Sequence, residues 1–388
     1  MWIKIAKFVV EEKTGMKFSE IPGNESTKQR MRAMCTTSHI PHALLLEGQS
    51  GVGKMMLARA FAQYIHCEHR DPDGDACGKC PSCLQHESFN HIDTIFIYPV
   101  VKGKSSKALS DDYAADWHEF LRESPWMDFD EWHSRLGSTT RPSIYVEESQ
   151  ELIHKLNFTS HRSQYKIVIV WLPERMNIEC ANKLLKIIEE PHSDTIFLFV
   201  SNNSAEIIPT IYSRCQRIEV KRLSDDVVAG CLTAGFAVDP AEAMSVAHVA
   251  EGSMVRAIGA IKAGSESQRH LDLFMRLMRL AYMRDVKNLK EWSATTAKLS
   301  REELLSFLTY CERMVRENFI LNLHDTRLNY LNSAEAAFSA KFSPFINERN
   351  VMKIIEVLNE AFADVSGNAN ARIVLFDVAI KMILLIKQ

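Results

Sequence analysis

The feature that most constrains this chain is a glycine-rich segment, 48–54 (GQSGVGK), between a short apolar run and a helical pattern. The apolar run is 43–47 (ALLLE), and apolar residues recur at helical spacing over 55–65. A strand, a glycine-rich turn and a helix in this order form the context that a phosphate-binding loop requires. The sequence therefore predicts a phosphate loop near the start of an α/β domain.

Four residues of this loop are the candidates for nucleotide binding. Gly48, Gly51 and Gly53 let successive backbone N–H groups face a phosphate, and Lys54 adds a point charge. The next residue should carry a hydroxyl for Mg²⁺, but it is Met55. Two interpretations stay open at this point: a degenerate loop that still binds ATP or ADP, and a relic that keeps its glycines for shape.

The acidic motif of a working ATPase is also absent from its expected place. An Asp at the end of a later strand would hold the metal, and a neighbouring Glu would polarise the attacking water. The candidate strand, 167–170, runs into 171–173 (WLP), so the first acid is Glu174. An acid beyond a proline is poorly placed for the metal. Together with Met55, this loss predicts that the chain does not hydrolyse ATP.

Short apolar runs alternate with helical patterns up to about residue 222. The run 166–172 (KIVIVWL) is typical of a strand buried on both faces, and 195–200 is another such run. Strands that alternate with helices predict a parallel α/β sheet with right-handed crossovers. After Leu223 the strands stop, and 266–388 is almost wholly helical in period.

Four of the nine cysteines are clustered, namely Cys67, Cys77, Cys80 and Cys83. We expect a cytosolic chain, and there such clustering favours metal over disulfides. Four thiolates at this spacing can close a tetrahedron around Zn²⁺, which leaves no open position for catalysis. The sequence therefore predicts a structural zinc module over 67–83, and an iron–sulfur cluster is the alternative.

Composition excludes several classes of protein. The 388 residues are 46% apolar and 24% charged, which excludes a mostly disordered or fibrous chain. A net charge of −3 gives no global positive field, which counts against a free-standing nucleic-acid-binding module. No apolar run approaches the ~20 residues of a membrane span, and the N-terminus lacks the pattern of a signal peptide. We expect a cytoplasmic protein with a candidate N-terminal extension at 1–16.

An insertion at about 102–140 interrupts the α/β pattern. It should hold one or two amphipathic helices, and we expect its three tryptophans, Trp117, Trp126 and Trp132, to form local core. Several histidines surround the cysteine region without metal-ligand spacing, and we expect surface or capping positions for His39, His42, His86 and His91.

A lone arginine precedes the last strand of the α/β domain, within 213–215 (SRC). An arginine at a domain edge is usually solvated or locally paired. In oligomeric ATPases it can instead reach the γ-phosphate of a neighbouring subunit as an arginine finger. Spacing alone favours the first interpretation of Arg214.

Five motifs in this order resemble the bacterial clamp-loader family, the AAA+ subunits of DNA polymerase III. They are 18–23 (FSEIPG), 40–43 (IPHA) before the phosphate loop, the cysteine spacing, 182–186 (NKLLK) followed by 189–191 (EEP), and 213–215 (SRC). The resemblance covers about 17–222 well, and the C-terminal helices match only in position and character. Retained zinc and finger motifs without metal handling resemble the delta-prime group within this family.

The resemblance implies a domain organisation and a function. It implies an AAA+ domain over 17–222, a helical lid over 223–264 and an all-α oligomerisation collar over 265–388. It also implies that Arg214 acts in trans as an arginine finger. The chain would then be an accessory subunit of a DNA-directed DNA polymerase, assembled with gamma/tau and delta type subunits, that helps to load the sliding clamp onto primed DNA. The alternative is an active gamma/tau-like ATPase subunit, and the role of the insertion stays open.

Overall fold

The computed structural model describes residues 16–36, 39–71, 74–102, 108–157, 163–191, 194–322 and 331–387. The chain divides into two compact units, Met1–Ala260 and Ile261–Gln388. Apart from Met16, the predicted N-terminal extension lies outside the described residues.

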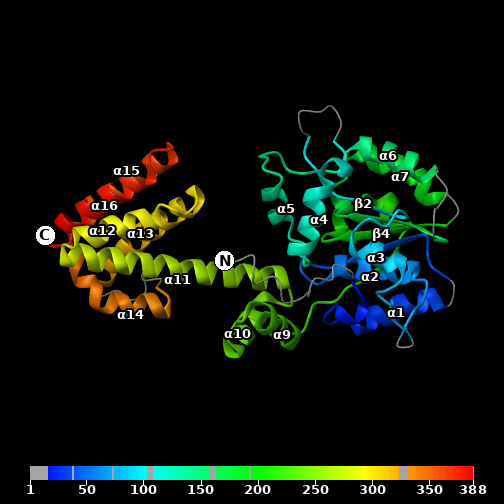
Figure 1. Ribbon diagram of the computed structural model, residues 1–388, viewed down its shortest axis with the longest axis horizontal. Coiled ribbons are helices and arrows are strands. Elements are labelled where there is room, and N and C mark those ends of the chain that lie inside the picture. Colours follow the sequence, from blue (N-terminus) through cyan, green and yellow to red (C-terminus); the bar gives the residue numbers. More distant parts are fainter. Residues whose placement is uncertain are drawn as a thin grey trace. The chain divides into compact units, whose positions relative to one another are not determined.

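The first unit is built on a parallel sheet of five strands (Figure 1). Their order across the sheet is β2-β3-β4-β1-β5. The strands are β1 (Ala43–Glu47), β2 (Thr94–Ile97), β3 (Lys166–Trp171), β4 (Thr195–Ser201) and β5 (Gln216–Glu219). The predicted parallel α/β sheet is therefore confirmed.

Helices lie on both sides of this sheet, with α6 and α7 on one side and α1 and α2 on the other (Figure 1). Alternate residues of the central strands, such as Val168 and Phe197, pack with Leu184 of α7 in one buried cluster. The helices of this unit are α1 (Glu25–Thr36), α2 (Lys54–His66), α3 (Pro81–Glu87), α4 (Ala114–Glu123), α5 (Phe129–Arg135), α6 (Val146–Asn157), α7 (Ile178–Glu189), α8 (Pro209–Tyr212), α9 (Asp225–Phe236) and α10 (Pro240–Ala250). Short 3₁₀ helices are η3 (Phe18–Glu20), η4 (Ser110–Tyr113), η5 (Pro173–Arg175) and η6 (Ser204–Glu206).

The second unit is helical throughout its described residues, 261–322 and 331–387. Its core gathers large apolar side chains, among them Phe274, Trp292 and Phe307. Its elements are α12 (Val286–Thr296), α13 (Arg301–Asn322), α14 (Ser333–Phe342), η8 (Ser343–Phe345), α15 (Val351–Ser366) and α16 (Ala371–Leu385).

One long helix, α11 (Met254–Met283), begins in the first unit and continues into the second. The boundary that we predicted between lid and collar, at 264/265, therefore falls inside a helix. Gly259 and Gly264 do not interrupt α11, because glycine lowers helix stability by only about 1 kcal/mol. Among the described residues, none of the helices has the length and apolar character needed to cross a bilayer.

Candidate phosphate loop and metal site

The predicted phosphate loop joins β1 to α2 and has the expected strand-turn-helix form. Gly53 precedes the first residue of α2 and has a φ of +89°, and Gly51 has a φ of +80°. A Cβ at Gly51 would lie 2.6 Å from the backbone nitrogen of Val255. Both positions favour glycine because an L side chain rarely adopts such a φ, and at Gly51 a side chain would also collide.

Lys54 is turned onto the loop itself. Its ammonium donates hydrogen bonds to the carbonyl oxygens of Gly48, at 2.7 Å, and Gln49. The side chain is only 5% exposed. Burial lowers the pKa of Lys54 to about 7, and the carboxylate of Glu174 partly opposes this shift. The charge that would meet a phosphate is therefore buried and bonded to backbone carbonyls.

The structure locates two residues that bear on metal binding: Met55, which stands where a Mg²⁺-binding hydroxyl is expected, and Glu174, the acid beyond the proline. Met55 is buried in the first turn of α2, where its thioether offers no hydroxyl. The Oε1 atom of Glu174 accepts hydrogen bonds from the amides of Asn202, at 2.8 Å, and Asn203, at 3.2 Å, after β4. Its Oε2 atom is buried without a hydrogen-bond partner among the described residues. Burial raises the pKa of Glu174. Glu174 thus turns back toward the sheet, where its negative charge favours the protonated form of Lys54. Its position beyond a proline in the sequence did not suggest this placement.

The start of α11 contacts the outer side of the phosphate loop. The Ser253 hydroxyl donates to the carbonyl oxygen of Ser50 at 2.8 Å, and the amide of Met254 donates to that of Gly51 at 3.0 Å. The arginine of this region, Arg256, forms an ion pair at 2.8 Å with Glu251. The loop is thereby fixed to the helical part of the same unit.

The four predicted cysteine ligands come together. Their four Sγ atoms lie within 4.8 Å of one another, and those of Cys77 and Cys83 are 3.9 Å apart. Four sulfurs bound to zinc at ~2.3 Å would be about 3.8 Å apart, so the cluster fits this ion. The amides of Lys79 and Cys80 donate to the Cys77 sulfur at 3.4 and 3.3 Å. Burial opposes ionisation, but these amides together with hydrogen bonds from the Cys67 and Cys80 side chains outweigh it and lower the pKa of Cys77 to about 6.

A second group of ring nitrogens within 4.8 Å of one another belongs to His66, His86 and His91. The rings of His66 and His91 stack at 4.2 Å and 11°. A metal lies near the plane of each imidazole that binds it, so two nearly parallel stacked rings cannot share one ion. Hydrogen bonds instead join His66 to His86 at 2.9 Å and His91 to Ser82 at 3.0 Å.

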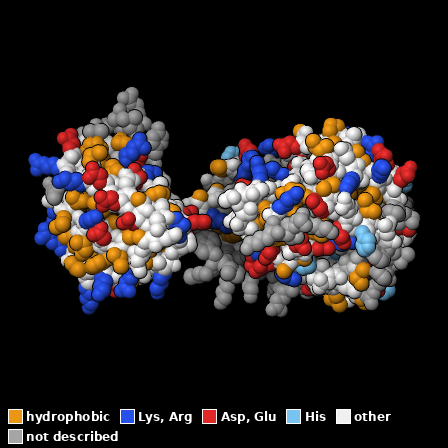
Figure 2. Space-filling model, turned by 90° about the horizontal axis from the view of Figure 1, so that it is seen from above, with side chains coloured by type: hydrophobic (Ala, Val, Ile, Leu, Met, Phe, Trp, Pro, Cys, Tyr) orange, Lys and Arg blue, Asp and Glu red, His pale blue; other side chains and the backbone are white. Residues whose placement is uncertain are grey.

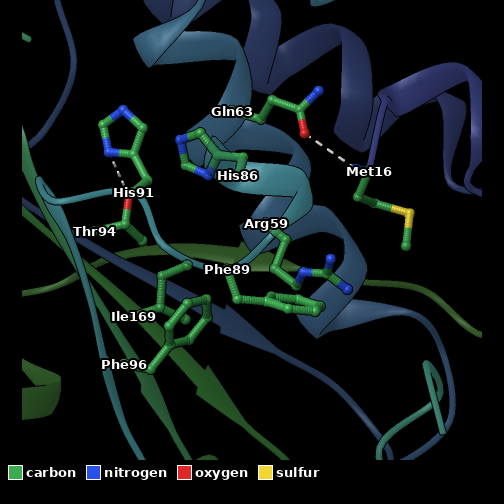
Figure 3. A pocket seen from close by; sticks show the side chains of 9 residues that line it. All are labelled: Met16, Arg59, Gln63, His86, Phe89, His91, Thr94, Phe96 and Ile169. Atoms are coloured by element: carbon green, nitrogen blue, oxygen red, sulfur yellow. Dashed lines mark hydrogen bonds between the residues drawn. The ribbon is translucent and has the colours of Figure 1, made fainter. Parts of the chain in front are cut away.

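These histidines correct one sequence prediction. We expected His86 and His91 at surface or capping positions, but His91 is 4% exposed and His86 lines a small cavity beside it (Figure 3). Sequence reasoning also missed His66, because a histidine at the end of an apolar helix carries no signal of its stacking partners. The three tryptophans of the insertion are buried, as expected.

Arg214 follows α8 at the domain edge and has partners within the chain. Its guanidinium pairs with Glu189 at the end of α7 and donates to the carbonyl oxygen of Thr210 at 2.8 Å. Both charged side chains remain partly exposed. The local pairing that spacing favoured is therefore present, and the finger role implied by the resemblance stays a prediction.

The strand order, the phosphate loop between β1 and α2 and the following helical segment define an α/β domain of the AAA+ class. The profile of the family described as "DNA polymerase III, delta subunit" matches residues 23–224, and the chain belongs to this family.

Individual relatives agree with this assignment. DNA polymerase III subunit delta' of Yersinia pestis is 32% identical over 176 residues, 45% of this chain and 40% of that protein. The delta' subunit of Haemophilus influenzae is 26% identical over 229 residues, 59% and 57% of the two chains. Subunit tau of Bacillus subtilis is 25% identical over 214 residues, 55% and 31%. This chain thus spans less than two thirds of the length of each. The solved clamp loader delta protein of Bacillus subtilis aligns with 92% of this chain over 99% of its own length, with 9% identity and a TM-score of 0.34, and this likeness carries no part of the assignment.

Proposed function

We propose that this chain is a non-hydrolysing clamp-loader subunit of the delta-prime type. It helps to load the sliding clamp onto primed DNA, as a cytoplasmic accessory subunit of DNA polymerase III that assembles with gamma/tau and delta type subunits. The observation that carries the proposal is a phosphate loop that keeps its form while Met55 fills the metal position. Similarity to delta' subunits supports the choice of type.

Each predicted site residue has a role in this proposal. Gly48, Gly51 and Gly53 shape a degenerate nucleotide site, and Lys54 stabilises the loop by bonding to its carbonyls. A structural zinc ion joins the cysteine cluster, Cys67, Cys77, Cys80 and Cys83. Arg214 meets the nucleotide of a neighbouring subunit rather than one held by its own chain.

Assembly tests the proposal directly. A tagged full-length chain should co-purify with the gamma/tau and delta type subunits of its own organism. A clamp loader rebuilt without this chain should load clamps onto primed DNA at a small fraction of the normal rate, and adding the chain back should restore the rate. Normal loading without the chain would contradict the proposed role.

The purified chain alone should release no phosphate from Mg²⁺-ATP above background. Met55→Thr should not rescue hydrolysis, because the hydroxyl it restores has no metal-binding acid after β3, where Leu172 and Pro173 stand. Steady-state phosphate release measures both proteins. An active gamma/tau-like subunit, the alternative function, would instead show turnover that Lys54→Ala abolishes.

The second unit should provide the oligomerisation collar. A chain that ends near Gly264 should keep the circular dichroism and cooperative melting of the α/β unit, which has its own core, but should lose stable assembly. The removed unit carries exposed apolar side chains on α15 and α16, including Met352 and Ile373, and Figure 2 shows apolar side chains on its surface. Size-exclusion chromatography with partner subunits measures the loss. Assembly with unchanged affinity would assign the contacts to the first unit.

A further inference from the structure

The insertion is part of the core at one edge of the sheet. It leaves β2 at the carboxyl end, where Trp117 of α4 stacks on Tyr98 at 3.9 Å. The indole N–H of Trp132 in α5 donates to the carbonyl oxygen of Pro99 at 2.7 Å. Trp117 also contacts Trp171 at the end of β3, with ring centres 5.3 Å apart. The insertion thus covers the carboxyl ends of β2 and β3. Open α/β sheets bind their ligands at the carboxyl ends of strands.

A tight turn between α4 and α5 presents Trp126. The amide of Met127 donates to the carbonyl oxygen of Ser124 at 3.0 Å, and Pro125 occupies the second position, which its fixed φ favours. Asp128 then caps α5. Trp126 is only 7% exposed although it lies in a turn, so something else in the unit covers it.

Trp126 is buried against the phosphate loop. A Cβ built on Gly53 would lie 3.6 Å from Cζ3 of Trp126 and 3.3 Å from Cε of Met56. Gly53 is the residue before α2, and the start of this helix is where backbone amides would meet an anion. The indole of Trp126 and the thioether of Met56 therefore lie against Gly53 at the start of α2.

The positively charged side chain of the loop, Lys54, is also bonded within the chain. The Lys54 ammonium bonds to two carbonyl oxygens of the loop and is buried. A nucleotide would have to displace the indole from Gly53 and also break the bonds of Lys54. The indole sits on a turn whose flanking helices are anchored by Trp117 and Trp132, so its displacement would expose core.

We propose that Trp126 blocks the phosphate loop, so that the insertion takes the place of ATP or ADP and holds the loop in one nucleotide-independent form. This inference rests on the proposed non-hydrolysing role. It gives a second reason why the chain would not hydrolyse ATP, besides the loss of the metal-binding residues. It also assigns a function to the insertion.

Hydrogen–deuterium exchange of the full-length chain, with and without millimolar Mg²⁺-ATP, tests the block. In the natural chain, ATP should leave the exchange of 48–56 unchanged. Trp126→Ala should speed the exchange of this segment by about tenfold or more, because the loop loses its cover and opens locally. Trp126→Phe, the matched control, should stay near the natural rate, and β3 and β4 should exchange alike in all three proteins.

Two outcomes would overturn the proposal. One is unchanged exchange of 48–56 in a folded Trp126→Ala protein. The other is protection of 48–56 by ATP in the natural chain, which decides the question even if the alanine variant does not fold. Failure here is separable from failure of the clamp-loader role: ATP binding by a chain that still supports clamp loading removes only the block, whereas a chain that never joins the complex removes only the role.

Discussion

A clamp loader rebuilt with Arg214→Ala should assemble normally but hydrolyse ATP and load clamps far more slowly than the natural complex. A guanidinium stabilises the charge that spreads over the γ-phosphoryl group, and arginine fingers in related chemistry contribute about 10³–10⁵ in rate. One finger among several sites should give a smaller loss in the whole complex. DNA- and clamp-stimulated phosphate release and the rate of clamp loading measure it.

The local contacts of Arg214 contribute little to stability, so this test should report on function rather than on folding. Its pair with Glu189 is partly exposed, and such pairs contribute about 0–1 kcal/mol, so the substitution should leave folding intact. For the same reason the guanidinium can leave Glu189 at little cost when a neighbour's phosphate is in reach. Glu189→Ala, the matched control, removes the local pair but keeps Arg214, and a complex with this variant should load clamps at a near-normal rate.

A second variant separates charge from shape. Arg214→Lys should be nearly as slow as the alanine variant, because a point charge lacks the planar fork that binds two phosphate oxygens. Normal loading rates with Arg214→Ala would establish that this arginine is only a surface residue paired with Glu189, and would remove the role in trans.

Replacing Cys80 by serine should release the proposed zinc ion and unfold the module around it. Metal binding is folding energy in such small sites, with apparent values of about 10–16 kcal/mol in zinc-finger peptides. Cys80 also caps α3 through its side chain. A serine oxygen can still accept that bond, so the substitution isolates the loss of the metal ligand. Elemental analysis should fall from one zinc per chain, and proteolysis within 67–91 should accelerate.

The effect should spread to the segment before α1. Asp75, inside the module, accepts hydrogen bonds from the amides of Phe18, at 3.2 Å, and Ser19, at 2.8 Å. A loosened module therefore frees the backbone that precedes the first helix. Cys215→Ser, which lies outside the cluster, should keep its zinc and serves as the control. Freshly purified natural protein that holds no zinc, or holds iron instead, would contradict the assignment.

Much of this architecture could be predicted because its signals are local. The apolar run of β1, the glycines after it and the periodicity of α2 are all read within a few turns of chain. The cysteine cluster is equally local, since its four cysteines are close together in the sequence. The apolar run over 166–172 likewise identified β3, because a strand buried on both faces must be apolar throughout.

Other features depend on which elements pack together, and periodicity does not carry that information. The sequence predicts that Trp126 belongs to local core but not that its indole lies against Gly53. It does not predict that Glu174 returns to the amides after β4, nor that the rings of His66 and His91 stack. By itself the sequence determined the class of fold, the phosphate loop and the cluster of four cysteines. Only the tertiary structure decided what covers that loop and where its lysine points, because those contacts join residues far apart in the chain.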